Sequence, residues 1–355
     1  MTSWKTYRLG DITIMRNGKK RPNTQGTYPV YGGNGIMDYA DCYNAENTII
    51  VGRVGAYCGN VYQCKNKCWV SDNAISVSAN ELVDDNYLYY LMSSLDFHHH
   101  HIGGAQPLIT QDIIGGFEIF LPPLEEQRRI AGILGAIDDK IENNRRINTN
   151  LELQAQALYK QWFVDSSTVK LGDVVRTTSG GTPSRRHMEF YVGKYGWVKS
   201  KELNGSFITN TEESITDDAI AKSAAKLLPA KSILIAMYGA TVGQYAVLSH
   251  PMTCNQAVCA LLPNENYPYT YLFMVAKNIK EELANKAIGS AQQNISQVII
   301  KDIDLSSDIV KIKQFHKIVC PNFEVMDKNQ KENETLATLR DTLLPKLMNG
   351  EIITK

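Results

Sequence analysis

Mostly apolar residues recur at spacings of four and three over a long segment in the middle of the chain. The run comprises Ile130, Leu134, Ile137, Ile141, Asn144, Asn148, Leu151, Ala155, Leu158 and Trp162. This alternation is typical of a coiled-coil seam, here with polar residues at two central positions. A helix over 130–163 would be roughly 50 Å long. Because one apolar stripe cannot stabilise such a helix alone, the pattern predicts a partner helix.

A second, weaker seam near the C-terminal end of the chain is the candidate partner. It comprises Val325, Asn329, Glu332, Leu336, Leu339 and Leu343, ahead of Pro345. Each stripe could instead pack only against its own domain. The length and position of the stripes, one after each half of the chain, favour pairing of the two helices with each other.

The rest of the sequence is duplicated. Five landmarks recur in order, at residues 8–12 and 170–174, 48–51 and 232–235, 55–60 and 239–244, 72–75 and 255–258, and 102–110 and 288–296. The difference in residue number between the two copies is 162 at the first landmark, and this offset then stays between 183 and 186. The second copy is therefore predicted to carry one insertion, between Asp173 and Ser232. A period of this length indicates two whole domains rather than stacked repeats.

Each copy has the same predicted elements. β-branched runs at 48–51 and 232–236 predict strands that end in a Gly-Ala turn. Tyrosine-rich segments at 87–92 and 269–275 predict short helices, and each copy closes on a Gly-Gln turn and another apolar strand. The sequence thus predicts an α+β fold with two similar domains separated by two long helices. If the helices pair antiparallel, the domains lie at opposite ends, related by a pseudo-two-fold axis.

The predicted organisation is a first domain over residues 1–122, a helix over 123–165, a second domain over 166–305 and a second helix over 306–355. Lys and Arg number 37, as do Asp and Glu, and the second domain carries 14 basic against 12 acidic residues. With no strongly basic segment, binding to nucleic acid would depend on local basic clusters or on partner subunits.

Several features point to the cytoplasm. No apolar run approaches the ~20 residues that cross a bilayer, and the first residues lack a signal-peptide pattern. Seven cysteines without framework spacing are typical of a reducing compartment. We therefore expect a cytoplasmic protein that does not contact a membrane.

The chain resembles the specificity subunits of type I restriction–modification systems over essentially its whole length. The resemblance lies in the order domain, helix, domain, helix and in five strings: Tyr28-Pro-Val-Tyr-Gly-Gly-Asn-Gly, Leu121-Pro-Pro-Leu-Glu-Glu-Gln-Arg-Arg-Ile, Ala236-Met-Tyr-Gly-Ala-Thr-Val-Gly, Asn255-Gln-Ala-Val and Leu343-Leu-Pro-Lys-Leu-Met-Asn-Gly-Glu-Ile. The second copy departs from the pattern. It has Leu305-Ser-Ser-Asp-Ile-Val where the first has the Leu-Pro-Pro entry to its helix, so the start of the second helix is open.

This resemblance implies two target-recognition domains, each binding one half of a split, asymmetric site in double-stranded DNA, with the helices setting the gap. Methyltransferase subunits would dock on the helices and methylate adenine from S-adenosylmethionine, and translocase–nuclease subunits would join for restriction. The chain itself would be non-catalytic, with no cofactor or metal. Independently, the sequence lacks a phosphate-binding Gly-x4-Gly-Lys-Ser/Thr loop, a Gly-x-Gly-x-x-Gly string and the Asn/Asp-Pro-Pro-Tyr/Phe string of adenine methyltransferases.

Two other classes of function stay open from the residues alone. The helices and repeats could form an adaptor that binds proteins rather than DNA, or the tyrosine-rich helices could carry an unrecognised active site. Salt-dependent DNA binding separates the specificity subunit from both, and incubation with S-adenosylmethionine and DNA tests for a methyltransferase.

Basic residues in the loops are the candidate DNA contacts. Lys19, Lys20 and Arg21 lie in the polar loop of the first copy, and Arg185, Arg186 and His187 lie in that of the second. Lys199 and Lys201 lie in the insertion, where base recognition is expected. Arg53 and Gln244 flank the Gly-Ala turns, and these side-chain types pair with guanine and adenine in the major groove. Exposed loops without a ligand are the alternative for each.

Four weaker patterns have a structural interpretation that we favour. The glycines at 55, 59, 239 and 243 could bind phosphate, but tight turns explain them. The tract His98 to His101 could bind a metal, but an exposed helix end is simpler. The pair Cys64 and Cys68 lacks the second pair of a zinc site. The tyrosines of the short helices, Tyr87, Tyr89, Tyr90, Tyr269 and Tyr271, could stack on bases, but their helical spacing favours core packing.

Overall fold

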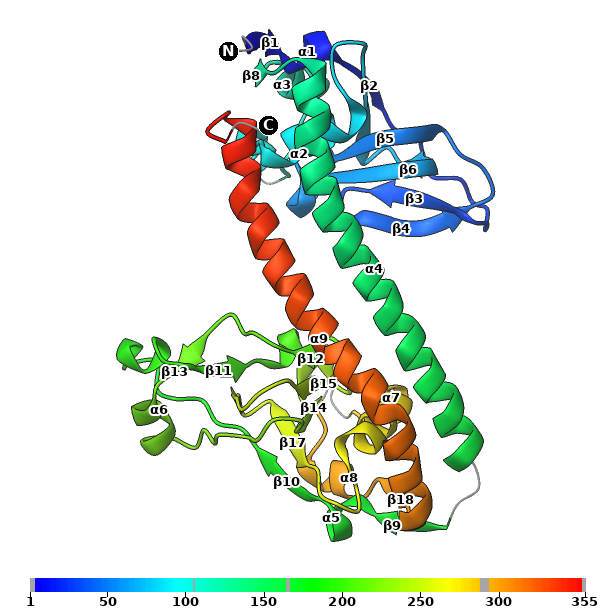
Figure 1. Cartoon of the computed structure of the whole chain (residues 1–355), viewed down its shortest axis with the longest axis vertical. Coiled ribbons are helices and arrows are strands. Elements are labelled where there is room, and N and C mark those ends of the chain that lie inside the picture. The colour runs from blue at the N-terminus through cyan, green and yellow to red at the C-terminus, as the bar shows by residue number, and fades with distance from the viewer. Residues whose placement is uncertain (1–3, 105, 164–166, 288–293, 353–355) are drawn as a thin grey trace. The chain divides into compact units, whose positions relative to one another are not determined.

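A computed structural model describes residues 4–104, 106–163, 167–287 and 294–352. The chain forms two compact units (Figure 1). One comprises Met1–Ile141 with Thr335–Lys355, and the other comprises Glu142–Glu334. Each unit mixes helices with sheet, so the predicted α+β class is confirmed. Both long helices contribute one half to each unit, because the unit boundaries fall inside them.

The first unit is built on a six-stranded sheet in the order β2-β7-β5-β6-β3-β4, antiparallel except for the β3–β6 pair. The predicted strand at 48–51 lies within β5, where residues 48–52 are all buried. Helix α2 begins where the Asp84 side chain accepts hydrogen bonds from the backbone N–H groups of Asn86 and Tyr87. The elements are β1 (Lys5–Arg8), α1 (Leu9–Ile12), β2 (Thr13–Asn17), β3 (Tyr28–Gly32), β4 (Gly35–Ala40), β5 (Ala45–Gly52), η1 (Gly55–Tyr57), β6 (Val61–Val70), β7 (Ala74–Ala79), α2 (Asp85–Ser94), η2 (Phe97–His100), α3 (Gln111–Gly115) and β8 (Glu118–Leu121).

The second unit has a five-stranded sheet, β10-β17-β14-β15-β12, and a three-stranded sheet, β13-β11-β16. Its predicted strand at 232–236 is β14, buried throughout, and its predicted short helix is the longer α7. The elements are β9 (Thr168–Lys170), α5 (Leu171–Val174), β10 (Arg176–Ser179), η3 (Met188–Tyr191), β11 (Tyr195–Val198), η4 (Ser200–Glu202), β12 (Phe207–Ile208), β13 (Ser214–Ile215), α6 (Asp217–Ala221), β14 (Ile233–Ala236), η5 (Gly239–Thr241), β15 (Tyr245–Leu248), β16 (Thr253–Cys254), β17 (Val258–Leu262), α7 (Tyr269–Asn285), α8 (Gln297–Lys301) and β18 (Asp304–Ser306).

Strand register confirms the duplication. Ile49 of β5 pairs with positions 63 and 77, and Ile233 of β14 pairs with positions 247 and 261, so all three positions keep an offset of 184. The fifth landmark cannot be compared, because Ala105 and residues 288–293 lie outside the described residues.

The predicted single insertion is in fact divided. Tyr31 of β3 and Val198 of β11 occupy equivalent positions, because their carbonyls accept hydrogen bonds from the backbone N–H groups of Ser71 and Asn255. Their offset of 167 exceeds the starting offset of 162 but falls short of 184. Five extra residues therefore precede β11, and the remaining 17 lie between β11 and β14. Sequence landmarks alone could not detect this because none falls between the two parts.

Helix α4 (Leu124–Phe163) follows two prolines and runs for 40 residues. Every position of its predicted seam is buried or half-buried, so the predicted register is confirmed. Gln127 anchors the helix to the first domain. Its Nε2 donates to the carbonyls of Pro122 (2.8 Å) and Leu82 (3.1 Å), and its Oε1 accepts from the N–H of Asp84 (2.9 Å).

Helix α9 (Ile309–Met348) also has 40 residues, and it starts directly after Asp308, whose side chain accepts the backbone N–H of Lys311 at 3.0 Å. Its predicted seam was wrong in register at two positions. Val325 and Leu339 are 43% and 46% exposed, and the neighbouring Met326 and Arg340 lie further inside. The error arose because several inward positions are polar, so hydrophobicity alone selected outward side chains. The helix also continues beyond Pro345.

Antiparallel pairing of the helices is visible within each unit. In the second unit, Asn144 of α4 donates to Asn333 of α9 at 3.0 Å, and Asn148 accepts from Asn329 at 2.8 Å. In the first unit, the Arg340 guanidinium lies 2.8 Å from an Asp138 carboxylate oxygen. The first-unit core also contains Ile130 and Leu134 of α4 with Leu347 and Met348 of α9. Residue numbers rise along one helix as they fall along the other, as predicted.

The tyrosine-rich helices are core elements. Tyr87 and Tyr90 of α2 are buried in the core of the first unit, and Tyr269 and Tyr271 of α7 are buried in that of the second. Tyr89 is half-buried. The core interpretation is therefore confirmed for the four buried rings, which are not available for base stacking in this conformation. Within the described part of the chain, no helix is both long enough and apolar enough to span a membrane.

Candidate nucleic-acid interface

The polar loop after β10 in the second unit is held by contacts with its neighbours. The backbone N–H of Gly181 donates to the Cys254 carbonyl (2.9 Å), and the Trp197 indole N–H donates to the Gly181 carbonyl (2.9 Å). The Tyr191 hydroxyl donates to the Pro183 carbonyl (2.6 Å). These contacts fix the loop against β11 and η3, so the basic residues that follow start from an ordered backbone.

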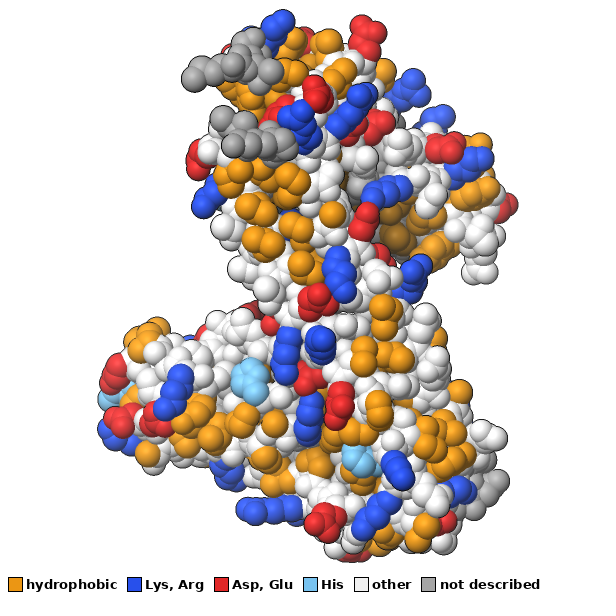
Figure 2. Space-filling model, viewed as in Figure 1, with side chains coloured by type: hydrophobic (Ala, Val, Ile, Leu, Met, Phe, Trp, Pro, Cys, Tyr) orange, Lys and Arg blue, Asp and Glu red, His pale blue; other side chains and the backbone are white. Residues whose placement is uncertain are grey.

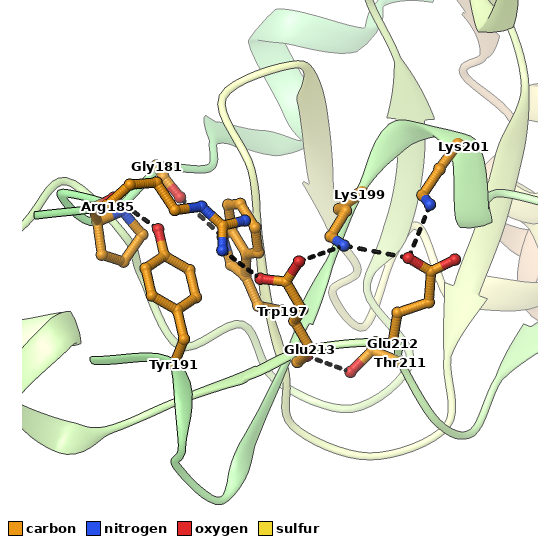
Figure 3. Close-up of polar contacts among 10 residues, drawn as sticks. Gly181, Arg185, Tyr191, Trp197, Lys199, Lys201, Thr211, Glu212 and Glu213 are labelled. Atoms are coloured by element: carbon orange, nitrogen blue, oxygen red, sulfur yellow. Dashed lines mark hydrogen bonds and ion pairs between the residues drawn. The ribbon is translucent and has the colours of Figure 1, made fainter. Parts of the chain in front are cut away.

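Arg185 is held in place by two rings and a carboxylate (Figure 3). Its guanidinium carbon lies 3.9 Å from the centre of the Tyr191 ring and 5.3 Å from that of Trp197. Its Nη1 forms an ion pair with Glu213 Oε2 at 2.7 Å. The contact with Glu213 raises the pKa of Arg185 further. A stacked, paired guanidinium keeps a defined orientation, as base recognition requires.

Lys199 and Lys201 belong to the same network. Lys199 Nζ lies 2.6 Å from Glu213 and 3.1 Å from Glu212, and Lys201 Nζ lies 2.7 Å from Glu212. The ion pair with Arg185 and then the hydrogen bond from Lys199 hold the pKa of Glu213 below its usual range. The structure thus brings three of the predicted residues together around two carboxylates. Sequence reasoning missed both carboxylates, although they lie in the same insertion as the lysines, because cross-loop pairing leaves no local pattern.

The other two basic residues of this loop differ from Arg185. Arg186 is exposed, and no carboxylate of the described residues forms an ion pair with its guanidinium. The His187 ring packs on Phe190 with ring centres 5.0 Å apart, and its Nδ1 lies 2.9 Å from a Glu189 carboxylate oxygen. Arg186 therefore carries the charge in this loop that is most available to a phosphate.

In the first unit, Lys19, Lys20 and Arg21 are exposed in the loop after β2. Arg21 forms an ion pair with Asp38 of β4. The backbone N–H of Lys19 donates to the Val70 carbonyl, as that of Gly181 does to Cys254. The two basic triplets lie in equivalent loops but not at equivalent positions, because Gly181, four residues before Arg185, is the counterpart of Lys19.

The Gly-Ala segments form tight turns, η1 and η5. Gly55, Gly59, Gly239 and Gly243 all have φ between +74° and +88°. A Cβ on Gly59 would lie 2.8 Å from the His98 backbone nitrogen, and one on Gly243 would lie 2.5 Å from the Lys280 carbonyl oxygen. The N–H groups of Gly55, Gly59 and Gly243 donate to backbone carbonyls, so they cannot bind a phosphate. The turn interpretation is therefore supported.

The two residues beside these turns are half-buried. Arg53 lies after β5, where its backbone N–H donates to the Asn73 carbonyl and its carbonyl accepts from the Ile109 N–H. Its Nε is buried and has no hydrogen-bond partner among the described residues. The backbone N–H of Gln244 donates to the Thr241 carbonyl at 2.9 Å. Neither side chain joins the cluster around Glu213.

The metal interpretations gain no support. His98 Nδ1 lies 3.0 Å from the Cys58 carbonyl oxygen, and His99 Nδ1 lies 2.5 Å from an Asp96 carboxylate oxygen. Cys64 and Cys68 are buried in β6, and burial raises the pKa of the Cys68 thiol, which opposes the thiolate form that a metal binds. Over the residues that the structure describes, no three potential ligands cluster around a common point.

Charge is dispersed on the surface. Figure 2 shows Lys and Arg side chains interspersed with Asp and Glu on the face drawn. The interspersion agrees with the equal numbers of basic and acidic residues. Local clusters, rather than a broad basic face, are therefore the candidate contacts with nucleic acid.

The chain contains two copies of one α+β domain, and each copy has a basic loop at the same edge of its sheet. Each copy is followed by a 40-residue helix. This arrangement defines a targeting protein with a duplicated recognition domain. The family model of the type I restriction modification DNA specificity domain matches residues 1–153 and 164–312. The chain belongs to this family, whose members direct a restriction–modification complex to DNA sites and are not themselves catalytic.

Individual relatives agree with this assignment. The type I restriction enzyme HindI specificity subunit of Haemophilus influenzae is 27% identical over 70% of this chain and 72% of its own length. The MjaIX specificity subunit of Methanocaldococcus jannaschii is 26% identical over 83% of this chain and 75% of its own length. The S subunit of a type I system from M. genitalium has the same fold, with a TM-score of 0.66, 17% identity and coverage of 98% and 96%. The adaptor alternative is not supported.

Proposed function

We propose that this chain recognises a bipartite, asymmetric site in double-stranded DNA, with one half bound by residues 1–122 and the other by residues 166–305. The observation that carries the proposal is the duplicated sheet edge. Equivalent backbone hydrogen bonds hold the first residues of the loop after β2 and of the loop after β10. The two loops nevertheless differ in length and in their basic residues. One scaffold with two different loops suits two different half-sites.

We rank the proposed DNA contacts by the exposure of their charged groups and by the ion pairs that these groups form. Arg186, Lys19 and Lys20 come first because their charged groups are exposed and form no ion pair among the described residues. Arg185, Lys199 and Lys201 are oriented by carboxylates, which suits base contacts better than phosphate contacts. The remaining proposed contacts are Arg21, Arg53, His187 and Gln244.

We further propose that methyltransferase and translocase–nuclease subunits dock on α4 and α9, and that the assembly acts in the cytoplasm. Both helices expose apolar side chains away from their shared seam. Leu153 of α4 is 54% exposed, and Ile318 and Val325 of α9 are 53% and 43% exposed. Exposed apolar positions on long helices are typical of surfaces that bind other helices.

The DNA proposal is tested by the salt dependence of binding. Arg186→Ala in the full chain, assembled with its modification subunits, should lower the slope of log affinity against log salt by about 0.9, because one phosphate is no longer neutralised. Lys286→Ala is the control, because Lys286 is an exposed cation at the end of α7, away from the proposed docking helices, and pairs with Glu282 of α7 at 2.6 Å. An unchanged slope in a folded Arg186→Ala protein would contradict the proposed role of Arg186.

Independent recognition by the two domains is tested by grafting. Replacing residues 1–122 with the corresponding domain of a relative should change one half of the methylated motif and leave the other half intact. Methylation mapping of DNA from cells that express the chimera with its modification subunits gives the result. A change in both halves, or in neither, would contradict independent recognition of the half-sites by the two domains.

A further inference from the structure

Three cations and two carboxylates form a continuous chain at the surface of the second unit. Arg185 and Lys199 contact Glu213 from two sides, and Lys199 and Lys201 both contact Glu212 (Figure 3). The inner pair is Lys199 and Glu213, with side chains 17% and 28% exposed. The net charge of these five groups is +1. Two of the three positive charges of this network are therefore already compensated by the protein itself.

The backbone at the two carboxylates is fixed. The Glu213 carbonyl accepts hydrogen bonds from the Trp197 backbone N–H (2.9 Å) and the Thr211 hydroxyl (2.7 Å). The Glu202 carboxylate bridges the backbone N–H groups of Lys199 (2.7 Å) and Glu212 (2.8 Å). Since both ends of the network rest on ordered backbone, a phosphate cannot displace the carboxylates by a simple movement of the loop.

This arrangement discriminates between kinds of DNA contact. A phosphate offers only acceptors and a negative charge, so it would be repelled by Glu213 while competing for Arg185. A G·C base pair offers both kinds of group in the major groove, because guanine O6 and N7 accept from arginine and the cytosine amino group donates to a carboxylate. Glu213 would accept from the cytosine through Oε1, because its Oε2 is buried beside Arg185. Such a base pair can therefore satisfy Arg185 and Glu213 together.

We propose that Glu213, assisted by Glu212, is a specificity-determining residue that keeps Arg185 and Lys199 from binding phosphates of non-target DNA and admits a G·C pair of the target half-site. The proposal rests on the DNA-binding function proposed above. It assigns these acidic residues a part in recognition that the basic residues alone cannot perform.

The test is Glu213→Gln in the full chain with its modification subunits, measured on the methylated target site and on an unrelated duplex. Binding to the unrelated duplex should tighten and its salt slope should rise by up to about 0.9. The ratio of target to non-target affinity should fall on the order of tenfold, the lower end of the discrimination that recognition of one base provides. Glu281→Gln is the matched control, because it removes the same charge from an exposed position on α7.

The outcomes are distinguishable. An unchanged ratio of target to non-target affinity, including the case in which both duplexes bind more tightly by the same factor, would overturn the assignment of Glu213 to specificity. If Glu213→Gln does not fold, as judged by thermal unfolding, Glu212→Gln at the more exposed end of the network gives the same test. A wild-type complex that binds the target site no more tightly than the unrelated duplex would contradict the proposed DNA recognition itself, whereas failure of Glu213→Gln alone would remove only this inference.

Discussion

Asn329 of α9 donates a hydrogen bond from its side-chain amide to Asn148 of α4, at 2.8 Å. Asn148 in turn donates to the Met326 carbonyl at 3.1 Å, and one turn away Asn144 donates to Asn333. The centre of the helix seam in the second unit is therefore a layer of hydrogen-bonded amides between apolar layers. Polar residues at such positions specify register and orientation at a cost in stability.

This pairing predicts opposite effects for single and double substitutions. Asn148→Leu alone should destabilise the protein by about 1–2 kcal/mol, because it leaves the buried Asn329 amide without its acceptor. Asn148→Leu combined with Asn329→Leu should recover that stability by replacing both partners with apolar groups. Denaturant unfolding of the single and double variants measures the coupling. The exposed Asn150→Leu is the control, and additive effects at Asn148 and Asn329 would contradict the pairing.

A second prediction concerns the entry of α4. Gln127 is 1% exposed and makes three hydrogen bonds that join the helix to the first domain. Gln127→Ala should reduce the free energy of unfolding by about 2 kcal/mol, because buried backbone groups lose their partner. Gln154→Ala, at an exposed position of the same helix, should change it by less than about 0.5 kcal/mol. Similar effects for both variants would show that Gln127 does not anchor the helix.

Regular spacing explains which features could be predicted from the sequence. The α4 seam, the strands at 48–51 and 232–236 and the tyrosine-rich helices all follow from local periodicity, and the structure confirms them. The α9 register was wrong at Val325 and Leu339 because its inward positions include Asn333 and Arg340, which hydrophobicity does not mark. Local periodicity identifies a seam only where the seam is apolar.

The candidate interface shows a different limit. Lys199 and Lys201 could be proposed from their type and their place in the insertion. Their partners Glu212 and Glu213 are more than ten residues away, and only folding of β11 against β13 brings them within 3.1 Å. Such pairing depends on tertiary contacts, so residue type alone overestimated the free positive charge of this surface.

The contact between α9 and the second domain predicts a dependence of stability on pH. Asp327 is 6% exposed and accepts from Lys231 (2.6 Å) and Ser249 (2.5 Å). Burial alone would raise the pKa of Asp327, but the hydrogen bonds from Lys231 and Ser249 outweigh burial and lower it below its usual value. A lowered carboxyl pKa contributes stability that is present above the pKa of the unfolded chain and is lost as pH falls through the folded pKa.

Asp327→Asn should therefore lose stability at neutral pH and reduce the loss of stability between about pH 5 and pH 2. Lys231→Met should act in the same direction by removing the nearer cation from the buried carboxylate, which keeps the more exposed Lys331 at 3.3 Å, and should cost about 2 kcal/mol at neutral pH. Unfolding free energies measured across this range give the comparison. Glu281→Gln, far from Asp327 in sequence and exposed, should leave the pH profile unchanged. A wild-type pH profile in Asp327→Asn would contradict the role of Asp327.

The two glycines of the first Gly-Ala turn differ in what surrounds them, and this difference yields the last prediction. Gly55 and Gly59 both have positive φ, so alanine at either position should cost about 1–2 kcal/mol in backbone strain. A Cβ on Gly55 would meet open space, whereas one on Gly59 would lie 2.8 Å from the His98 nitrogen and 2.9 Å from the Phe97 carbonyl carbon. Gly59→Ala should therefore destabilise the protein by at least about 1 kcal/mol more than Gly55→Ala, because backbone must move. Chemical unfolding measures the difference, and equal destabilisation would contradict close approach as the reason for Gly59.

The corresponding glycine pair in the second unit gives an independent test of the same effect. Gly239 meets open space, and a Cβ on Gly243 would lie 2.5 Å from the Lys280 carbonyl oxygen, so Gly243→Ala should again be the more harmful change of the pair. The folded Gly55→Ala and Gly239→Ala proteins also test the phosphate alternative, because a backbone cradle would lose geometry when its glycine is replaced. DNA affinity and salt slope should stay at wild-type values in both, since the turns serve the sheet and not the ligand. A lower salt slope in either variant would return that turn to the DNA interface.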